Sequence, residues 1–232
     1  MPNRIVELAK QAYTWFYTRR SVSRLIVSQF TRLYYQTPVP VRTWHNTTWF
    51  GTKVLKTPLD LWNYQEIVSE LQPDLLIECG TAAGGSAYYF ACLFELIGSG
   101  RVISVDVAEN EDRPEHDRIF YILGSSIARD TLDRIRDEVS GATTVMVVLD
   151  SDHSRDHVRE ELKLYSDFVT GGSYLIVEDT CINGHPVAPQ FGPGPMEAVK
   201  SFLQSDERFV ADPRDRKFLM TFNPNGYLRR LP

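Results

Sequence analysis

Hydrophobic and polar residues alternate along this chain in two recurring patterns. Between residues 58 and 180, short apolar runs are separated by stretches in which apolar side chains recur every three or four positions. Each short run ends in polar or glycine residues and is followed by one of the longer stretches. Apolar runs of this kind are typical of parallel strands that crossover helices bury on both faces. The pattern therefore predicts an α/β, doubly wound fold.

The expected elements follow one another in regular order. Helices are predicted over residues 58–71, 86–97, 128–139 and 156–169. Strands are predicted over residues 74–80, 101–107, 120–124, 144–150 and 173–180. A helix over 196–204 then precedes two closing strands, one within 208–213 and one within 217–230 with a turn at Asn225 and Gly226. These elements predict a mostly parallel, seven-stranded sheet.

The N-terminal part of the chain differs from this alternation. Residues 3–36 have a helical pattern, and residues 37–58 hold three prolines and many β-branched residues, which predicts an extended connecting segment. We place a boundary at residue 57, giving a helical arm with its connection over 1–57 and one domain over 58–232. Residues 1–42 carry seven Lys or Arg and one acid, a net charge of +6 against −11 for the rest. Such an arm meets an acidic partner, a membrane surface or another subunit, or is a solvated helix face.

Composition narrows the class of protein. A chain of 232 residues with 43% hydrophobic content can bury a sizeable core, and the net charge of −5 argues against nucleic acid as a partner. Cys79, Cys92 and Cys181 are too scattered for a disulfide framework or a zinc site, which favours a reducing, cytoplasmic compartment. The sequence shows neither a secretory signal nor an apolar run of the ~18 residues that a membrane span needs. We expect a soluble protein without a transmembrane segment.

Two strand ends suggest a nucleotide-like ligand, because ligands of open α/β sheets bind beyond the carboxyl ends of the strands. The first is "ECGTAAGGS" at 78–86, whose glycines allow a sharp turn and bring a ligand close to the start of the next helix. It is neither a dinucleotide fingerprint, since Ala82 replaces the middle glycine, nor a P-loop, and a plain tight turn is the alternative. The second is Asp106, placed to accept hydrogen bonds from the two hydroxyls of a ribose or, alternatively, to cap a helix.

Two further strand ends bring acids together. "VVLD" ends in Asp150 and "LIVED" ends in Glu178 and Asp179, at the tips of consecutive strands. Three neighbouring carboxylates repel one another, and a hard divalent cation removes that repulsion, so Mg²⁺ is the expected metal. Separate helix-capping roles for the acids are the alternative.

Histidines follow the first of these acids in "DSDHSRDH". His153 lies three residues beyond Asp150, where a neutral imidazole can take a proton from a metal-bound hydroxyl. A zinc-protease motif is excluded because no Glu follows the first His. An iron site built from Asp150 or Asp152 with His153 and His157 remains open, as does a histidine that only occupies a helix start.

These motifs occur together in a known family. "TWFGTKVLKTPLDLWNYQEIVSELQPDLLIECGTAAGGSAYYFA", with "VISVDV", "LGSS", "LDSDHS" and "YLIVEDTCINGHP", resembles the cephalosporin hydroxylase family over roughly residues 43–200. Despite that label, its members look like S-adenosylmethionine-dependent O-methyltransferases, and the similarity extends more distantly to macrolide-sugar and catechol-type enzymes. The resemblance implies a Rossmann-like methyltransferase fold, S-adenosylmethionine and Mg²⁺ as cofactors, a homo-oligomer, and methylation of a hydroxyl on a sugar or other natural product.

The resemblance also implies roles for individual residues. The metal ligands would be Asp150, Glu178 and Asp179, with Asp150 also close to the cofactor, and His153 would be the catalytic base. Catechol-type relatives use a lysine as base, and none is present in "DSDHSRDH". The methionine part of the cofactor would lie against Glu78, Gly80 and Ser86, and its ribose against Asp106. Its adenine would lie against Gly124, Ser125 and Ser126.

Two other classes of function remain as alternatives. One is a non-haem iron oxygenase that uses His153, His157 and an acid, although such an enzyme has no need of a ribose-binding acid at position 106. The other is a non-catalytic small-molecule-binding subunit, which has no reason to gather three carboxylates. The acceptor would be selected by the arm, by "TWHNTTWFG" and by the Gly- and Pro-rich loop at 183–195, where Trp44, Trp49 and Phe191 either stack on a ligand or pack.

Overall fold

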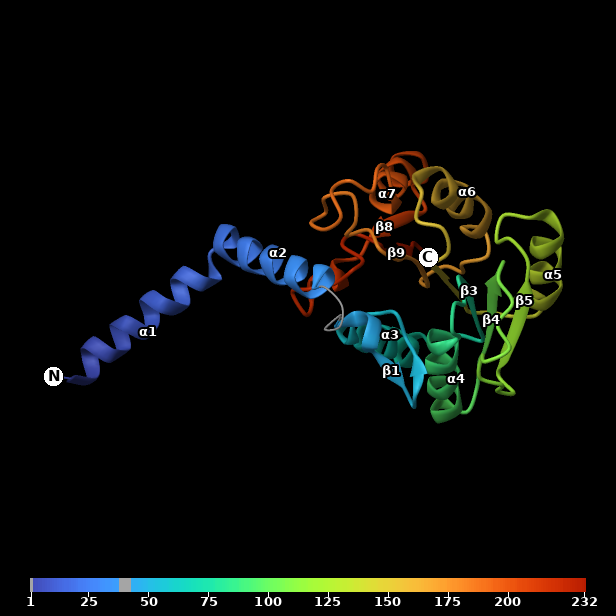
Figure 1. Ribbon diagram of the computed structural model, residues 1–232, viewed down its shortest axis with the longest axis horizontal. Coiled ribbons are helices and arrows are strands. Elements are labelled where there is room, and N and C mark those ends of the chain that lie inside the picture. The colour runs from blue at the N-terminus through green and yellow to red at the C-terminus, as the bar shows by residue number, and fades with distance from the viewer. Residues whose placement is uncertain (1, 38–42) are drawn as a thin grey trace.

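A seven-stranded sheet forms the centre of the molecule, with helices on both faces (Figure 1). The computed structural model describes residues 2–37 and 43–232. The strand order is β5-β4-β3-β6-β7-β9-β8, and β9 runs in the direction opposite to the other six strands. The predicted doubly wound, mostly parallel sheet is confirmed. The strands are β3 (Leu75–Cys79), β4 (Arg101–Asp106), β5 (Ile119–Leu123), β6 (Val145–Leu149), β7 (Tyr174–Val177), β8 (Phe209–Ala211) and β9 (Tyr227–Arg230).

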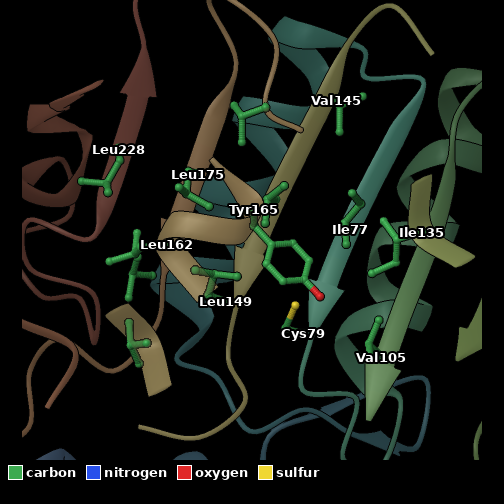
Figure 2. Packing of buried hydrophobic residues seen from close by; sticks show 14 of the residues in the cluster. Ile77, Cys79, Val105, Ile135, Val145, Leu149, Leu162, Tyr165, Leu175 and Leu228 are labelled. Atoms are coloured by element: carbon green, nitrogen blue, oxygen red, sulfur yellow. The ribbon is translucent and has the colours of Figure 1, made fainter. Parts of the chain in front are cut away.

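The two faces of the sheet bury separate apolar cores. One core packs the sheet against α3 (Pro58–Leu71) and α4 (Gly85–Ile97), and the other packs it against α5 (Arg129–Val139), α6 (Arg155–Tyr165) and α7 (Pro195–Ser205). Along β3, Ile77 and Cys79 face the second core and Leu76 the first, which is the alternation that a strand produces. Figure 2 shows the second core, where the ring of Tyr165 lies beside Cys79.

Ligands are expected where the strand order reverses, which in this sheet is between β3 and β6. The first residue beyond each of these strands donates a backbone hydrogen bond to a neighbouring strand, from Asp150 N to Cys79 O of β3 (2.7 Å) and from Gly80 N to Val105 O of β4 (2.8 Å). Beyond the next strand, Glu178 N donates to Leu149 O (2.9 Å). The glycine turn and the acids therefore lie at one edge of the sheet.

Several predicted elements differ from the structure. The second closing strand is limited to β9, after the turn, because Thr221 and Phe222 hydrogen-bond the buried carboxylate of Asp60 instead of a strand. The predicted helix at 156–169 ends at Tyr165. The connecting segment contains a short helix, η1 (Trp44–Asn46), and a hairpin of β1 (Thr48–Trp49) and β2 (Thr52–Lys53), while its residues 38–42 lie outside the described part of the chain.

The arm consists of two helices, α1 (Pro2–Thr18) and α2 (Arg20–Gln36), which extend away from the sheet (Figure 1). The single predicted helix is interrupted at Arg19, whose backbone is extended. The C-terminal part of α2 rests on the body, since Tyr35 contacts Phe222 and Arg32 Nε donates to Pro186 O (3.1 Å). Helix α3 begins at Pro58, but the division into two domains stays a prediction. No helix of the described residues combines the length and the apolar character that crossing a membrane requires.

Candidate active site

A cavity of about 530 Å³ opens at the carboxyl ends of β3, β4 and β6. Most of the predicted site residues line this cavity: Gly80, Ser86, Asp106, Gly124, Ser125, Ser126, Asp150, His153 and Asp179. The structure thus brings together residues that are up to 99 positions apart in the chain. Glu78 and Glu178 are fully or almost fully buried and are not part of the lining.

The glycine turn is shaped by the close approach of two chain segments. Gly80 has a φ of +98°, and a Cβ at this position would lie 1.9 Å from the backbone oxygen of Asp150. The turn passes from β3 into α4, whose N-terminal residues Gly85 and Ser86 face the cavity. Because the first N–H groups of a helix have no partner within the helix, this end of α4 suits a polar or anionic ligand.

Asp106, the last residue of β4, accepts hydrogen bonds from the glycine turn. Its Oδ2 accepts hydrogen bonds from the backbone N–H groups of Thr81 (3.0 Å) and Ala82 (2.7 Å) and forms an ion pair with Arg113 (3.2 Å). Its Oδ1 accepts one from Ala108 N (2.9 Å). Asp106 thereby holds the glycine turn, and since a carboxylate has about four acceptor positions, Oδ1 retains capacity for a ligand hydroxyl.

Glu78 lies in β3 beneath this turn. Its Oε2 accepts a hydrogen bond from Ser104 Oγ (2.6 Å), whereas its Oε1 is buried and has no hydrogen-bond partner among the described residues. Burial raises the pKa of this carboxyl, and the positive charge of Lys56 opposes that shift. An unpaired buried carboxylate oxygen is costly, so it marks a place where a ligand donor would be stabilised.

The predicted adenine end of the cavity contains a polar network. His157 Nε2 lies 3.1 Å from Ser126 Oγ and 3.2 Å from Ser151 Oγ, and it pairs with the buried Glu161 at 3.4 Å. The hydrogen bond to Glu161 raises the pKa of His157, against the effect of burial. His157 therefore contributes to the wall of the cavity.

The acids form a compact group with one histidine. Donor atoms of Asp150, His153 and Asp179 lie within 4.8 Å of one another, and among the described residues these three make up the group of His, Cys, Asp and Glu side chains suited to a metal ion. His153 Nε2 is 3.3 Å from Asp179 Oδ2. Burial raises the pKa of both Asp150 and Asp179. A cation at this group would oppose that rise by stabilising the charged carboxylates.

Glu178, the third predicted ligand, is held by other side chains. Its Oε1 accepts hydrogen bonds from Lys56 Nζ (2.8 Å) and from the hydroxyl of Tyr64. The next residue, Asp179, has a left-handed backbone with φ of 54°, a conformation that Asp tolerates better than most residues, and its N–H donates to Asn223 Oδ1 (2.9 Å). This turn directs Asp179 towards His153.

The residues of the iron alternative are not assembled in the same way. Asp152 Oδ1 accepts from Ser154 N (2.7 Å) at the start of α6, and His157 binds the serines and Glu161 described above. Neither belongs to the candidate metal group. The geometry therefore favours Asp150 over Asp152 as a ligand.

Lys56 is the residue that sequence reasoning missed. It immediately precedes Thr57, the N-cap of α3, and its Nζ lies 2.6 Å from Asp150 Oδ2 and 2.8 Å from Glu178 Oε1. A lysine beside a helix start is usually solvated, so "VLKTPLD" contains no local signal for a buried ammonium. Of the aromatic residues considered for stacking, Trp44 lines the cavity, Trp49 packs against Tyr89, and Phe191 is exposed.

Comparison with known proteins identifies the family. The model of the family named Rhamnosyl O-methyltransferase/CmcI matches residues 41–231. The chain belongs to this family. The rhamnosyl O-methyltransferase of Mycobacterium tuberculosis is 40% identical over 218 residues, which cover 90% of this chain and 86% of that protein. The expected family and the expected O-methyltransferase activity are confirmed.

Solved structures agree with the fold of this Rhamnosyl O-methyltransferase/CmcI member. Apo CmcI matches with a TM-score of 0.64 at 21% identity, covering 86% of this chain and 83% of CmcI. CmcI with Mg and SAM matches with a TM-score of 0.63 at 20% identity, covering 86% and 84%. The predicted methyltransferase fold is confirmed.

Proposed function

We propose that this O-methyltransferase transfers the methyl group of S-adenosylmethionine to a sugar hydroxyl, with Mg²⁺ held by Asp150, Glu178 and Asp179. The observation that carries the proposal is the convergence of Asp150, His153 and Asp179 at a cavity whose other wall is the Gly80 turn. The relative from Mycobacterium tuberculosis is named for rhamnosyl O-methylation, and a solved CmcI carries Mg and SAM. A deoxyhexose is accordingly the acceptor we propose.

The residues around the cavity fit both S-adenosylmethionine and Mg²⁺. Asp106 and the start of α4 line the cavity and suit a ribose and polar atoms of the cofactor. Glu78, buried beneath the Gly80 turn, would add negative charge near the cofactor's ammonium group without lining the cavity itself. The carboxylates of the acid group are the oxygen ligands that Mg²⁺ prefers. Trp44, which stacks on Tyr35 and His45 with ring centroids 5.2 and 3.6 Å apart, lines the cavity and would form an aromatic wall beside a sugar ring.

The roles of the side chains follow from this arrangement. Mg²⁺, when bound, supplies a Lewis acid that lowers the pKa of the acceptor hydroxyl. The imidazole of His153 would take the hydroxyl proton as the new C–O bond forms and the S–C bond of the donor breaks, leaving a methyl ether and S-adenosylhomocysteine. Asp179, whose Oδ2 lies 3.3 Å from His153 Nε2, would stabilise the protonated imidazole.

Calorimetric titration of the metal-stripped protein tests this proposal. We expect S-adenosylmethionine binding in the wild type and its loss in Asp106→Ala, and Mg²⁺ binding in the wild type and its loss in Glu178→Gln. Asp167→Asn removes an acid that is 75% exposed and pairs with Arg208, so it serves as a control that leaves both bindings intact. Tight binding of ferrous iron without any binding of S-adenosylmethionine would overturn the proposal in favour of an oxygenase.

We also propose that the chain works as a cytoplasmic homo-oligomer assembled through the arm. All three cysteines are free thiols, in keeping with a reducing compartment. Helices α1 and α2 expose large apolar side chains, among them Ile5 (72%), Leu8 (58%) and Leu33 (66%). Light scattering checks the assembly: a multiple of the 26.6 kDa chain mass supports it, and a monomer refutes it.

A further inference from the structure

Lys56 differs in its surroundings from the other described basic residues. Its side chain is 2% exposed, and it is the one Lys or Arg among the described residues that is buried. Its ammonium bridges two of the three proposed metal ligands, at 2.6 Å from Asp150 Oδ2 and 2.8 Å from Glu178 Oε1. A buried ammonium is stabilised only when it is paired, so these two contacts account for its position.

The surroundings of Lys56 are strongly acidic. Besides Asp150 and Glu178, the carboxyl groups of Glu78 and Asp60 are buried nearby, Glu78 acting on Lys56 and Asp60 on Glu178 through their charges. Among the described residues, Lys56 is the Lys or Arg that forms ion pairs with Asp150 and Glu178. Removing it would leave like charges facing one another in a poorly solvated space.

The backbone around Lys56 is fixed on both sides. Val54 belongs to the apolar core at 1% exposure, and Thr57 is the buried N-cap of α3. The backbone at Lys56 is therefore anchored on both sides, so the ammonium changes position only through rotation of the Lys56 side chain. Lys56 also lines the cavity, so the side chain has space into which it can withdraw.

We propose that Lys56 is a positioning residue that acts as a built-in counter-ion of the metal site: it holds Asp150 and Glu178 in place without metal and competes with the divalent cation for both. The inference rests on the metal ligands of the proposed function. Mg²⁺ and the ammonium seek the same carboxylate oxygens, so binding the metal weakens the contacts of Lys56. The competition lowers the affinity for metal while it preserves the site.

The test measures Mg²⁺ affinity by calorimetry on the purified full chain, without S-adenosylmethionine or acceptor. Lys56→Met removes the charge and nearly preserves the length, and we expect Mg²⁺ to bind at least about ten-fold more tightly, because a competing positive charge next to two ligands is lost. Lys53→Met is the matched control. Lys53 also lines the cavity and carries the same charge, but it is exposed and has no described contact with the acids, so its change in affinity should be less than about two-fold.

A second variant covers the case in which Lys56→Met does not fold. Lys56→Gln removes the charge but keeps a group that donates hydrogen bonds to both carboxylates, and it should show the same tighter binding. We also expect its melting temperature in EDTA to fall below that of the wild type and added Mg²⁺ to raise it more than in the wild type. If a folded neutral variant binds Mg²⁺ no more tightly than the wild type, the counter-ion role is refuted. Absence of Mg²⁺ binding in the wild type itself would refute the proposed metal site instead.

Discussion

The contact between the Gly80 turn and the tip of β6 can be tested by adding a single methyl group. In Gly80→Ala, the new Cβ would lie 1.9 Å from Asp150 O, 2.4 Å from Asp150 C and 2.9 Å from Ser151 N. All three are backbone atoms, which cannot turn away as a side chain would. The tips of β3 and β6 must therefore separate, and with them the glycine turn and Asp150.

The expected magnitude has two parts. A φ of +98° costs an L-residue about 1–2 kcal/mol, and forcing a methyl group into a filled space costs about 1–3 kcal/mol more. We therefore expect Gly80→Ala to lower the free energy of unfolding by roughly 2–5 kcal/mol. Because the same movement displaces Asp150 and the cavity wall, binding of S-adenosylmethionine should weaken as well.

Gly141→Ala separates the two parts. Gly141 has a φ of +88°, and a Cβ there meets nothing within 4 Å, so only the backbone cost of about 1–2 kcal/mol should appear. Urea denaturation of both variants gives the two unfolding free energies, and calorimetry gives the affinity for S-adenosylmethionine. Equal destabilisation by the two substitutions, with unchanged cofactor affinity, would show that the close contact at Gly80 has no energetic effect.

Three further predictions address other parts of the site. His153→Asn should lower kcat by about 10²–10⁴-fold in an assay with a methylatable sugar while metal binding persists, and an unchanged kcat would remove His153 from the reaction. Asp60→Ala removes a 1%-exposed side chain that accepts hydrogen bonds from Thr221, Phe222 and Tyr227. Because these donors are left unpaired, chemical denaturation should show a loss of about 1–3 kcal/mol in the free energy of unfolding, and a loss below about 0.5 kcal/mol would argue against this role. Folding raises the pKa of His157 above its ordinary value of 6.5. The protonated imidazole therefore stabilises the folded protein fully below pH 6.5, and this stabilisation is lost as the pH rises through the pKa of the folded state. The difference in the free energy of unfolding between the wild type and His157→Gln should shrink from pH 6 to pH 9. A difference that grows over this range would show that the pKa of His157 is not raised by folding.

Much of the fold and several residues of the candidate site can be predicted from local pattern alone. The helix over 58–71 was predicted with the bounds that the structure shows, and its N-cap Thr57 and its first residue Pro58 are start signals that act within a few residues. The strand tips at Gly80, Asp106, Asp150 and Asp179 were located because buried strands have a clear apolar signature and parallel strands share one functional edge. These features depend on interactions between near neighbours in the chain.

The remaining features were decided by contacts between distant residues. Lys56 lies 94 positions before Asp150 and 122 before Glu178, and a lysine carries no local sign that a fold will bury it. Residues 217–224 have the composition of a strand, yet Asp60, 161 positions before Thr221, draws them into a loop. The sequence alone therefore specifies which chemical groups reach the edge of the sheet, whereas the tertiary structure decides which charges meet there, because pairing depends on distances that only packing sets.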